Sequence, residues 1–238
     1  MRKSLPILSV LSLGLIFGGP VDIISKSATA ASHGKKVEWN LSTWGKRRAF
    51  TEGIEAVSKY VADKSEGHFT IKINYGGSLS KPRENLDGIS LGAFEAATFC
   101  ASYHADKNKS VTVLELPFLP IINGDVQKAA DLAVYSHPAT IKEMAKWNAK
   151  LMMSAALPQY EFMGRGKEPR TIADFKGMRV RALGGIGKAM KMIGAVPTTV
   201  TAPETYTAIE TGTVDAAAFA FYSHFSYKIN EVSTWRTT

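Results

Sequence analysis

Strand-type and helix-type segments alternate regularly between Thr171 and Phe219, and this alternation limits the chain to few folds. Strands that alternate with short helices indicate an α/β unit with a largely parallel sheet. In such sheets ligands bind at the carboxyl ends of the strands, where Arg181 lies. The expected elements are a helical lead-in at 172–174, a strand at 178–182, a glycine turn at 184–185, a helix at 186–193, a strand at 196–200, and then one more helix and one more strand.

The amino-terminal part of the chain predicts a second unit of the same kind. Apolar residues recur at helical spacing from Phe50 to Val61, which indicates an amphipathic helix packed on a sheet. Strands are expected on either side of it at 37–41 and 69–75. Ser80 with Pro82 is typical of the start of the next helix.

Two windows 120 residues apart, 84–99 and 204–219, align without a gap. They share six identities, and each has the pattern of a helix, a glycine and a strand of small residues that ends in Phe. The match is either generic helix-turn-strand chemistry or the sign of two lobes of similar build that face each other.

The segments between these windows predict further elements. An apolar stretch covers 110–119, and two helices are expected to break at His137–Pro138, because proline disfavours helix in the residue before it. Residues 151–156 predict a buried strand. Residues 158–166 are expected to follow as a loop on the ligand side of the sheet, and this loop carries Tyr160, Glu161, Phe162 and Arg165.

The first 30 residues have the order of a secretory signal peptide: a basic start, an apolar run at 5–17 and small residues at 28–30. A membrane anchor is the alternative, but the apolar run is shorter than the roughly 20 residues that a spanning helix needs. Export to the periplasm would permit disulfides, yet Cys100 is the single cysteine and cannot form one within the chain. The net charge of +8 is spread along the sequence and predicts no nucleic-acid role.

The motifs of the common enzyme classes are missing from the sequence. It has no GxSxG, HExxH or CxxC motif and no phosphate-binding glycine motif with its lysine. The five histidines are scattered without an i, i+4 pair, so no metal or cofactor is expected. Cys100 fits the role of a small buried hydrophobe better than that of a nucleophile.

Arg181 is the strongest candidate for recognition chemistry. A guanidinium holds a carboxylate through two parallel hydrogen bonds, and arginine is rarely buried without an anionic partner. The residues around Arg181 are those of a buried strand. Two readings follow, a ligand carboxylate or a structural salt bridge to Glu161 or Asp215.

These segments together resemble the extracytoplasmic solute receptors of tripartite ATP-independent periplasmic (TRAP) transporters, of the dicarboxylate-binding-protein type. The sequences GGSLS at 76–80 and LELPFLP at 114–120 are also similar to that family. The residues that fit the family pattern are Asp174, Lys176, Gly177, Arg181, Gly194, Ala195, Pro197, Glu204, Tyr206, Ala208, Gly212, Val214 and Asp215.

The resemblance implies a set of ligand contacts around Arg181, which would hold the substrate carboxylate. The other positions that match family contacts are Glu161 with Tyr160, Phe219, Thr43 with Trp44, and Phe99 with Cys100. Several of these residues differ from the family's usual polar ones, which indicates a less polar pocket for a monocarboxylate with an aliphatic or aromatic body.

The resemblance also implies a two-lobed periplasmic-binding-protein fold of type II-like α/β build. The expected divisions are a signal peptide at 1–30, lobe I with the first crossover at 31–155, a partial lobe II at 156–212, and a strand returning toward lobe I at 213–238. Family members usually continue for roughly another hundred residues, so the chain is expected to be truncated and its second lobe incomplete.

The function implied is a non-catalytic receptor that delivers a small organic acid to the membrane subunits of a TRAP transporter. A receptor for an ATP-driven importer or a sensor would have the same architecture. An exported enzyme that uses Glu161, Asp215 or Cys100 is the other alternative.

Overall fold

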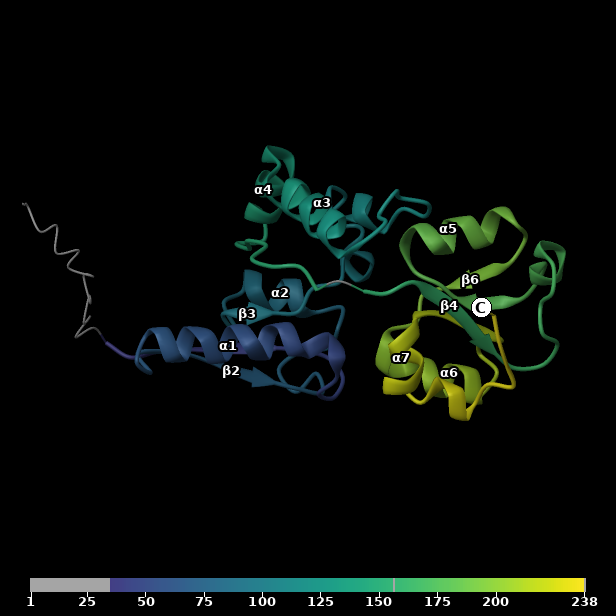
Figure 1. Ribbon diagram of the computed structural model, residues 1–238, viewed down its shortest axis with the longest axis horizontal. Coiled ribbons are helices and arrows are strands. Elements are labelled where there is room, and N and C mark those ends of the chain that lie inside the picture. The colour runs from purple at the N-terminus through teal and green to yellow at the C-terminus, as the bar shows by residue number, and fades with distance from the viewer. Residues whose placement is uncertain (1–34, 156, 238) are drawn as a thin grey trace, which may run out of the picture. The chain divides into compact units, whose positions relative to one another are not determined.

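The computed structural model describes residues 35–155 and 157–237. These residues belong to one compact unit, and they form two β-sheets with helices packed against them (Figure 1). The signal peptide predicted at 1–30 lies outside the described residues. The predicted lobe boundaries stay a prediction. Within the part of the chain that is described, no helix combines the length and the apolar character needed to cross a membrane.

The first sheet has three parallel strands in the order β2-β1-β3. They are β1 (Val37–Ser42), β2 (Phe69–Asn74) and β3 (Ala96–Ala97). Helix α1 (Glu52–Lys64) connects β1 to β2, as its apolar spacing predicts, and Ser58 on this helix donates a hydrogen bond to the carbonyl of Ile71. The helix predicted from Ser80 begins later than expected, as α2 (Asn85–Ser90), and the Ser80 side chain bonds to that of Asn85, the first residue of this helix.

The second sheet has five strands in the order β6-β5-β7-β4-β8. Its parallel part contains β5 (Arg179–Arg181), β6 (Val196–Thr198) and β7 (Ala216–Ala220), as the alternation after Thr171 predicts. Strands β4 (Tyr160–Gly164) and β8 (Trp235–Arg236) run antiparallel to their neighbours at one side. The sheet is therefore mixed and mostly parallel where Arg181 lies.

Helices cover both faces of the second sheet (Figure 1). Helix α5 (Gly184–Met192) covers one face, and α6 (Thr205–Glu210) with α7 (Phe221–Ser226) covers the other. All five residues of β7 are buried, which fits a central strand packed on both sides. The fold class is thus the predicted α/β architecture with helix-flanked sheets.

The two similar sequence windows adopt the same local structure in the same register. Helices α2 and α6 begin at positions 85 and 205, and strands β3 and β7 begin at 96 and 216. Gly92 and Gly212 end the helices with φ angles of 68° and 71°, in the left-handed region that favours glycine. Residues that are 120 positions apart in the two windows therefore occupy equivalent places in two helix-turn-strand units.

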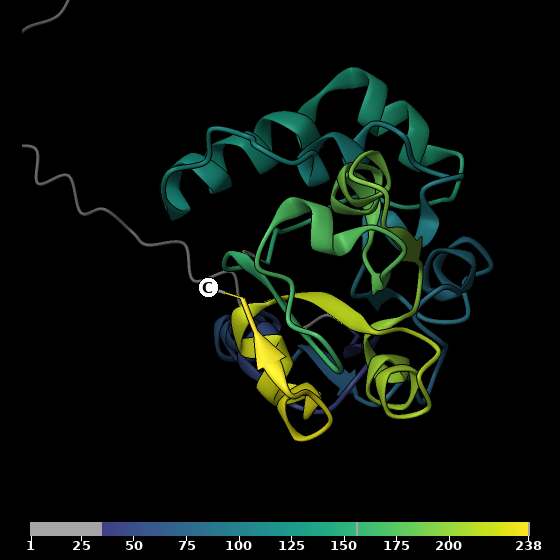
Figure 2. The same cartoon turned by 90° about the vertical axis from the view of Figure 1, so that its right-hand side faces the viewer.

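Helices α3 (Gly124–Ser136) and α4 (Pro138–Ala145) pack against each other and lie along the top of the view in Figure 2. They break at His137 as predicted, and its side chain caps α4 by accepting a hydrogen bond from the Ala139 amide. Short 3₁₀ helices complete the fold at Ala49–Thr51, Ala101–His104, Val111–Glu115, Ile172–Phe175, Ala202–Glu204 and Ile229–Glu231.

One strand prediction is wrong, and the error affects the site. Residues 151–155 form no strand, and the side chain of Met152 is 71% exposed. The strand forms instead at Tyr160–Gly164, in the segment expected to be a loop. Apolar character alone does not make a strand, because a strand needs partners, and it is 160–164 that pairs with both β7 and β8.

Candidate functional site

Arg181 ends β5 at the carboxyl edge of the parallel strands, and its residue surface is 1% exposed. Two backbone carbonyls fix the guanidinium. Nε donates to the carbonyl of Val200 over 3.0 Å, and Nη1 donates to the carbonyl of Ala218 over 2.9 Å. Val200 follows β6 and Ala218 lies in the middle of β7, and both strands neighbour β5, so the strand order itself places the charge.

Tyr103 reaches the same guanidinium from the segment that follows β3. Its hydroxyl oxygen accepts a hydrogen bond from Arg181 Nη2 over 3.4 Å and another from the Ala202 amide over 2.8 Å. Burial raises the pKa of Tyr103, so the phenol is neutral at physiological pH. The indole of Trp44 packs edge-on against it at a centroid distance of 5.7 Å. Tyr103 and Trp44, which come from the part of the chain that forms the first sheet, therefore cover Arg181.

Phe219 lies directly beside the charge. The Cζ atom of Arg181 is 4.0 Å from the centroid of the Phe219 ring, which is a cation–π contact. Tyr227 stacks on the same ring at 5.8 Å. Three of the predicted site residues, Arg181, Phe219 and Trp44, thus belong to one neighbourhood, together with Tyr103 and Tyr227.

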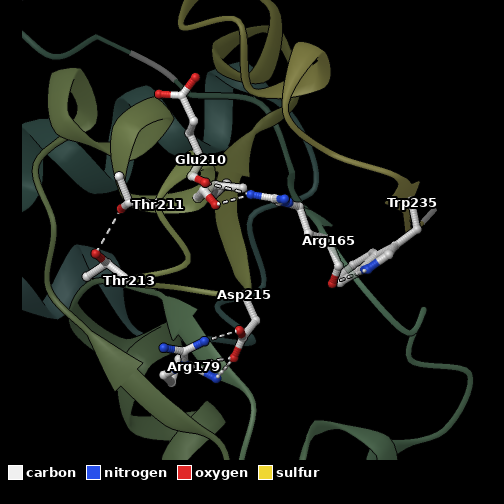
Figure 3. Close-up of polar contacts among 8 residues, drawn as sticks. Arg165, Arg179, Glu210, Thr211, Thr213, Asp215 and Trp235 are labelled. Atoms are coloured by element: carbon white, nitrogen blue, oxygen red, sulfur yellow. Dashed lines mark hydrogen bonds and ion pairs between the residues drawn. The ribbon is translucent and has the colours of Figure 1, made fainter.

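The structural salt bridge weighed for Arg181 is not formed among the described residues. Asp215 binds Arg179 instead, through Arg179 Nε at 3.0 Å and Nη2 at 2.5 Å (Figure 3). Hydrogen bonding to Arg179 lowers the pKa of Asp215. Glu161, the other candidate partner, forms no ion pair with any described residue, and its Oε2 atom is buried without a hydrogen-bond partner. Arg181 is a buried cation with no protein carboxylate beside it.

Tyr160 and Glu161 are separated by the pleat of β4. Glu161 pairs with Phe219 across the antiparallel ladder, so both side chains lie on the face that carries Arg181. Tyr160 lies on the opposite face and packs against the cluster that contains Val180 and Ala218. Burial raises the pKa of Tyr160 to about 12. By strand register only Glu161 is on the Arg181 face, but the charge of Arg181 acts on the Tyr160 hydroxyl, so a role for Tyr160 in binding stays a prediction.

Arg165 does not lie at the ligand side of the sheet, contrary to the expectation that a single loop carries it with Tyr160. It follows the other end of β4, where Nη1 donates to the carbonyls of Ile209 and Glu210 over 3.1 and 2.6 Å (Figure 3). Its own carbonyl accepts a hydrogen bond from Trp235 Nε1 over 3.1 Å. Arg165 therefore caps the carboxyl end of α6, where cations stabilise a helix.

Of the remaining predicted contacts, Cys100 belongs to the same neighbourhood as Arg181 and Phe219. Cys100 packs against the cluster around Trp44 and Phe219, and burial raises the pKa of its thiol to about 12. The Thr43 hydroxyl accepts a hydrogen bond from Thr98 over 3.1 Å, and Phe99 stacks on His104 at 5.4 Å. A role for Thr43 and Phe99 in binding stays a prediction.

Tyr103 is the site residue that sequence reasoning missed. It stands three positions after Cys100, just past the carboxyl end of β3, where ligand contacts are expected in an α/β sheet. The place of Tyr103 just after a strand end could have marked it as a candidate ligand contact. Its direct bond to Arg181 joins segments 78 residues apart, which no local pattern could show.

Two surface depressions lie elsewhere, along helix α6. They have volumes of about 500 and 400 Å³, and neither is lined by Arg181. No group of three or more His, Cys, Asp or Glu side chains in the described ranges is placed to hold a metal ion. Arg181 itself is covered by Tyr103 and Trp44.

Comparison with known proteins decides the family. Residues 42–237 match the family model DctP, described as bacterial extracellular solute-binding protein, family 7. The chain belongs to this family. The resemblance to TRAP receptors that we inferred from the sequence motifs is therefore confirmed. Family 7 consists of solute-binding receptors.

Among curated proteins, a monocarboxylate 2-oxoacid-binding periplasmic protein of Nostoc sp. is 26% identical over 183 residues. The match covers 76% of this chain and 50% of that protein. A solute-binding protein of Verminephrobacter eiseniae is 25% identical, with 75% and 53% covered. The chain thus spans about half the length of the curated relatives it matches.

Solved structures share the fold. A marine metagenome TRAP solute-binding protein specific for aromatic acids, solved with 3-hydroxybenzoate, superposes with a TM-score of 0.77 at 20% identity. A TRAP solute-binding protein from Rhodoferax ferrireducens with copurified benzoate gives 0.75 at 21% identity. The first match covers 86% of this chain and 64% of that structure, and the second covers 84% and 62%.

Proposed function

We propose that this protein is a periplasmic receptor that binds a small organic acid through Arg181 and delivers it to a TRAP-type secondary transporter. The observation that carries the proposal is the state of Arg181. It is 1% exposed, and no carboxylate of the described residues pairs with it. A buried charge without a counter-charge is costly, and an anionic ligand would remove that cost.

The guanidinium retains donors for such a ligand. It has five N–H groups, and three of them point to Val200, Ala218 and Tyr103. Two N–H groups are left for a carboxylate. The three fixed bonds hold the plane of the guanidinium in place, so a ligand carboxylate would meet a pre-organised group.

Similar proteins bind ligands of the same chemical class, which supports a carboxylate for this chain. The relative from Nostoc is described as a monocarboxylate 2-oxoacid-binding protein, and the solved structures hold 3-hydroxybenzoate and benzoate. Another, from Bordetella bronchiseptica, holds (R)- and (S)-mandelate and has a TM-score of 0.75 at 20% identity. The aromatic surroundings of Arg181 fit an acid with an apolar body.

Ligand entry requires that the cover over Arg181 moves. Tyr103 and Trp44 come from the part of the chain that holds the first sheet, and Arg83 from the same part donates to the carbonyl of Thr199 over 3.0 Å. Separating the two parts would expose Arg181. Closure around the ligand would then select the closed state through contacts that the open state lacks.

The proposal is of a receptor and not of an enzyme. The groups nearest to Arg181 are neutral or apolar, since burial raises the pKa values of Tyr103 and Cys100 far above neutrality. A buried thiol with such a raised pKa is a poor nucleophile. Binding and release, without bond breaking, are what this arrangement favours.

The test compares two arginines of the same strand. Arg181→Gln removes the charge at the site, and the control Arg179→Gln removes the same charge two residues away, where it pairs with Asp215. Affinities for benzoate, 3-hydroxybenzoate, mandelate and pyruvate are measured by calorimetry, and the fold of each variant is checked by circular dichroism. Losing one partner of a buried charged contact typically costs about 2–5 kcal/mol, so Arg181→Gln should weaken binding by roughly 30-fold or more.

Retained affinity in Arg181→Gln would refute the carboxylate role, as would an equal loss in Arg179→Gln. Delivery is tested separately with TRAP membrane subunits in proteoliposomes. Uptake of the bound acid should require this protein and an ion gradient, and it should not require ATP. Uptake only with an ATP-driven importer would point to that alternative.

A further inference from the structure

Glu161 carries a second unsatisfied group on the face that holds Arg181. Its Oε2 atom is buried and has no hydrogen-bond partner in the described part of the chain. An ionised carboxylate is an acceptor only, and a buried acceptor without a donor is costly. Such an atom at the edge of a binding site requires an explanation, and a ligand group that donates to it would supply one.

The strand order places Glu161 and Arg181 on either side of Phe219. Glu161 on β4 pairs with Phe219 on β7, and Arg181 on β5 pairs with Ala217, which lies on the same face of β7. Strands β5 and β4 are both neighbours of β7, so their backbones are roughly 10 Å apart. The long side chains of Arg181 and Glu161 shorten that span, and a small molecule could bridge it.

The neighbouring protein groups do not satisfy this carboxylate. His224 lies beside it, but His224 Nε2 is 3.2 Å from the backbone carbonyl of Glu161. Burial lowers the pKa of His224, so the ring is neutral and has one N–H, which that carbonyl takes. The other ring nitrogen, Nδ1, is then an acceptor and cannot donate to the carboxylate. Arg181 is bonded elsewhere, to the carbonyls of Val200 and Ala218 and to Tyr103.

We infer that the ligand carries an O–H or N–H donor in addition to its carboxylate, and that this donor binds the Glu161 carboxylate while Arg181 holds the acid. This inference rests on the proposed function and narrows its ligand class to hydroxy, amino or amide acids. A simple monocarboxylate without a donor would leave Glu161 unsatisfied in the closed protein. Discrimination follows from that penalty, because a site built around a buried polar group rejects the analogue that cannot bond to it.

The experiment uses ligand pairs that differ only in the donor. Mandelate is compared with phenylacetate, and 3-hydroxybenzoate with benzoate, by calorimetry on the purified protein. Phenylglycine serves as the N–H member beside mandelate. At least one donor-bearing acid should bind ten times more tightly than its donor-free partner, since a hydrogen bond to a charged group is typically of this strength.

Two variants of Glu161 test whether this residue is responsible. Glu161→Met removes the acceptor at similar volume, and Glu161→Gln removes the charge. Each should reduce the donor preference, to about one in Glu161→Met, and the donor-free acid should bind to Glu161→Met at least as tightly as to the wild type, because the penalty of the unsatisfied carboxylate is gone. Glu210→Gln is the control, because it removes a carboxylate that points away from the residues around it (Figure 3). The unliganded Glu161→Met protein should melt no lower than the wild type, since the lost carboxylate oxygen had no partner.

The outcomes separate this inference from the proposed function. If acids bind through Arg181 but the donor-free members bind as tightly, or if Glu161→Met keeps the donor preference, this inference alone is wrong. If no acid in the panel binds, or if Arg181→Gln binds as well as the wild type, the proposed function fails and this inference fails with it.

Discussion

Gly164 closes β4 at a point where the chain has no room for a side chain, and Gly164→Ala should destabilise the second sheet. A Cβ atom there would lie 2.5 Å from the backbone oxygen of Asp215, 2.5 Å from Cζ2 of Trp235 and 2.8 Å from Cβ of Ala216. None of these atoms is the free end of a flexible side chain. Overpacking of this kind costs about 1–3 kcal/mol, and three close contacts place it near the upper value.

An opposing effect lowers the net change. Alanine restricts the unfolded chain and returns about 0.4–1 kcal/mol, so the expected net loss for Gly164→Ala is about 2 kcal/mol. For a chain of 238 residues this corresponds to a fall in Tm of roughly 4–8 °C. Because β4 also carries Glu161, a shift of this strand should weaken ligand binding as well.

Scanning calorimetry and urea denaturation measure the change. Gly124→Ala is the matched control, since Gly124 begins α3 and a Cβ there meets no atom within 4 Å. The control should be neutral or should gain up to about 1 kcal/mol. If Gly164→Ala melts at or above the wild-type temperature while Gly124→Ala behaves as expected, the steric reasoning is refuted.

Two further predictions concern titratable groups. Because burial raises the pKa of Cys100 to about 12, a thiol reagent at pH 8 should label the folded protein at least tenfold more slowly than the protein in guanidinium, and equal rates would contradict the burial. Burial also lowers the pKa of His104 below 6.5, so the unfolded chain binds more protons below that pH and stability should fall as the pH drops from 7.5 toward 5. His104→Gln should flatten that dependence of Tm on pH, and an unchanged slope would assign it to other groups.

Much of the fold follows from local patterns. The spacing of apolar residues predicts α1, and the break at His137 follows from the proline after it. The windows that begin at Glu84 and Glu204 predict where the helix and the strand begin in two helix-turn-strand units. The prediction works because a helix, a glycine in the left-handed region and a buried strand require the same residue pattern in both places. These features depend on residues close together in the chain.

The strand at 160–164 depends on distant partners, and local patterns place it wrongly. Residues 151–155 are the more apolar run, yet no strand forms there. Strand β4 is defined by its pairing with β7 and β8, more than 50 residues further along the chain. The periodicity of a sequence does not reveal which strand a segment will pair with. The segment that looks most like a strand, 151–155, is therefore not the segment that pairs, 160–164.

The misplaced strand also explains why the site was only partly predictable. Tyr160 and Glu161 are neighbours in sequence, and a loop could have turned both toward a ligand. In a strand, successive side chains point to opposite faces, so only one of them can share a face with Arg181. That residue is Glu161, whose carboxylate is left buried and unpaired, whereas Tyr160 joins the core on the other face. The pleat of β4 thus places the Glu161 carboxylate on the face that carries Arg181, and this shared face is the basis of our inference that the ligand is an acid with a donor.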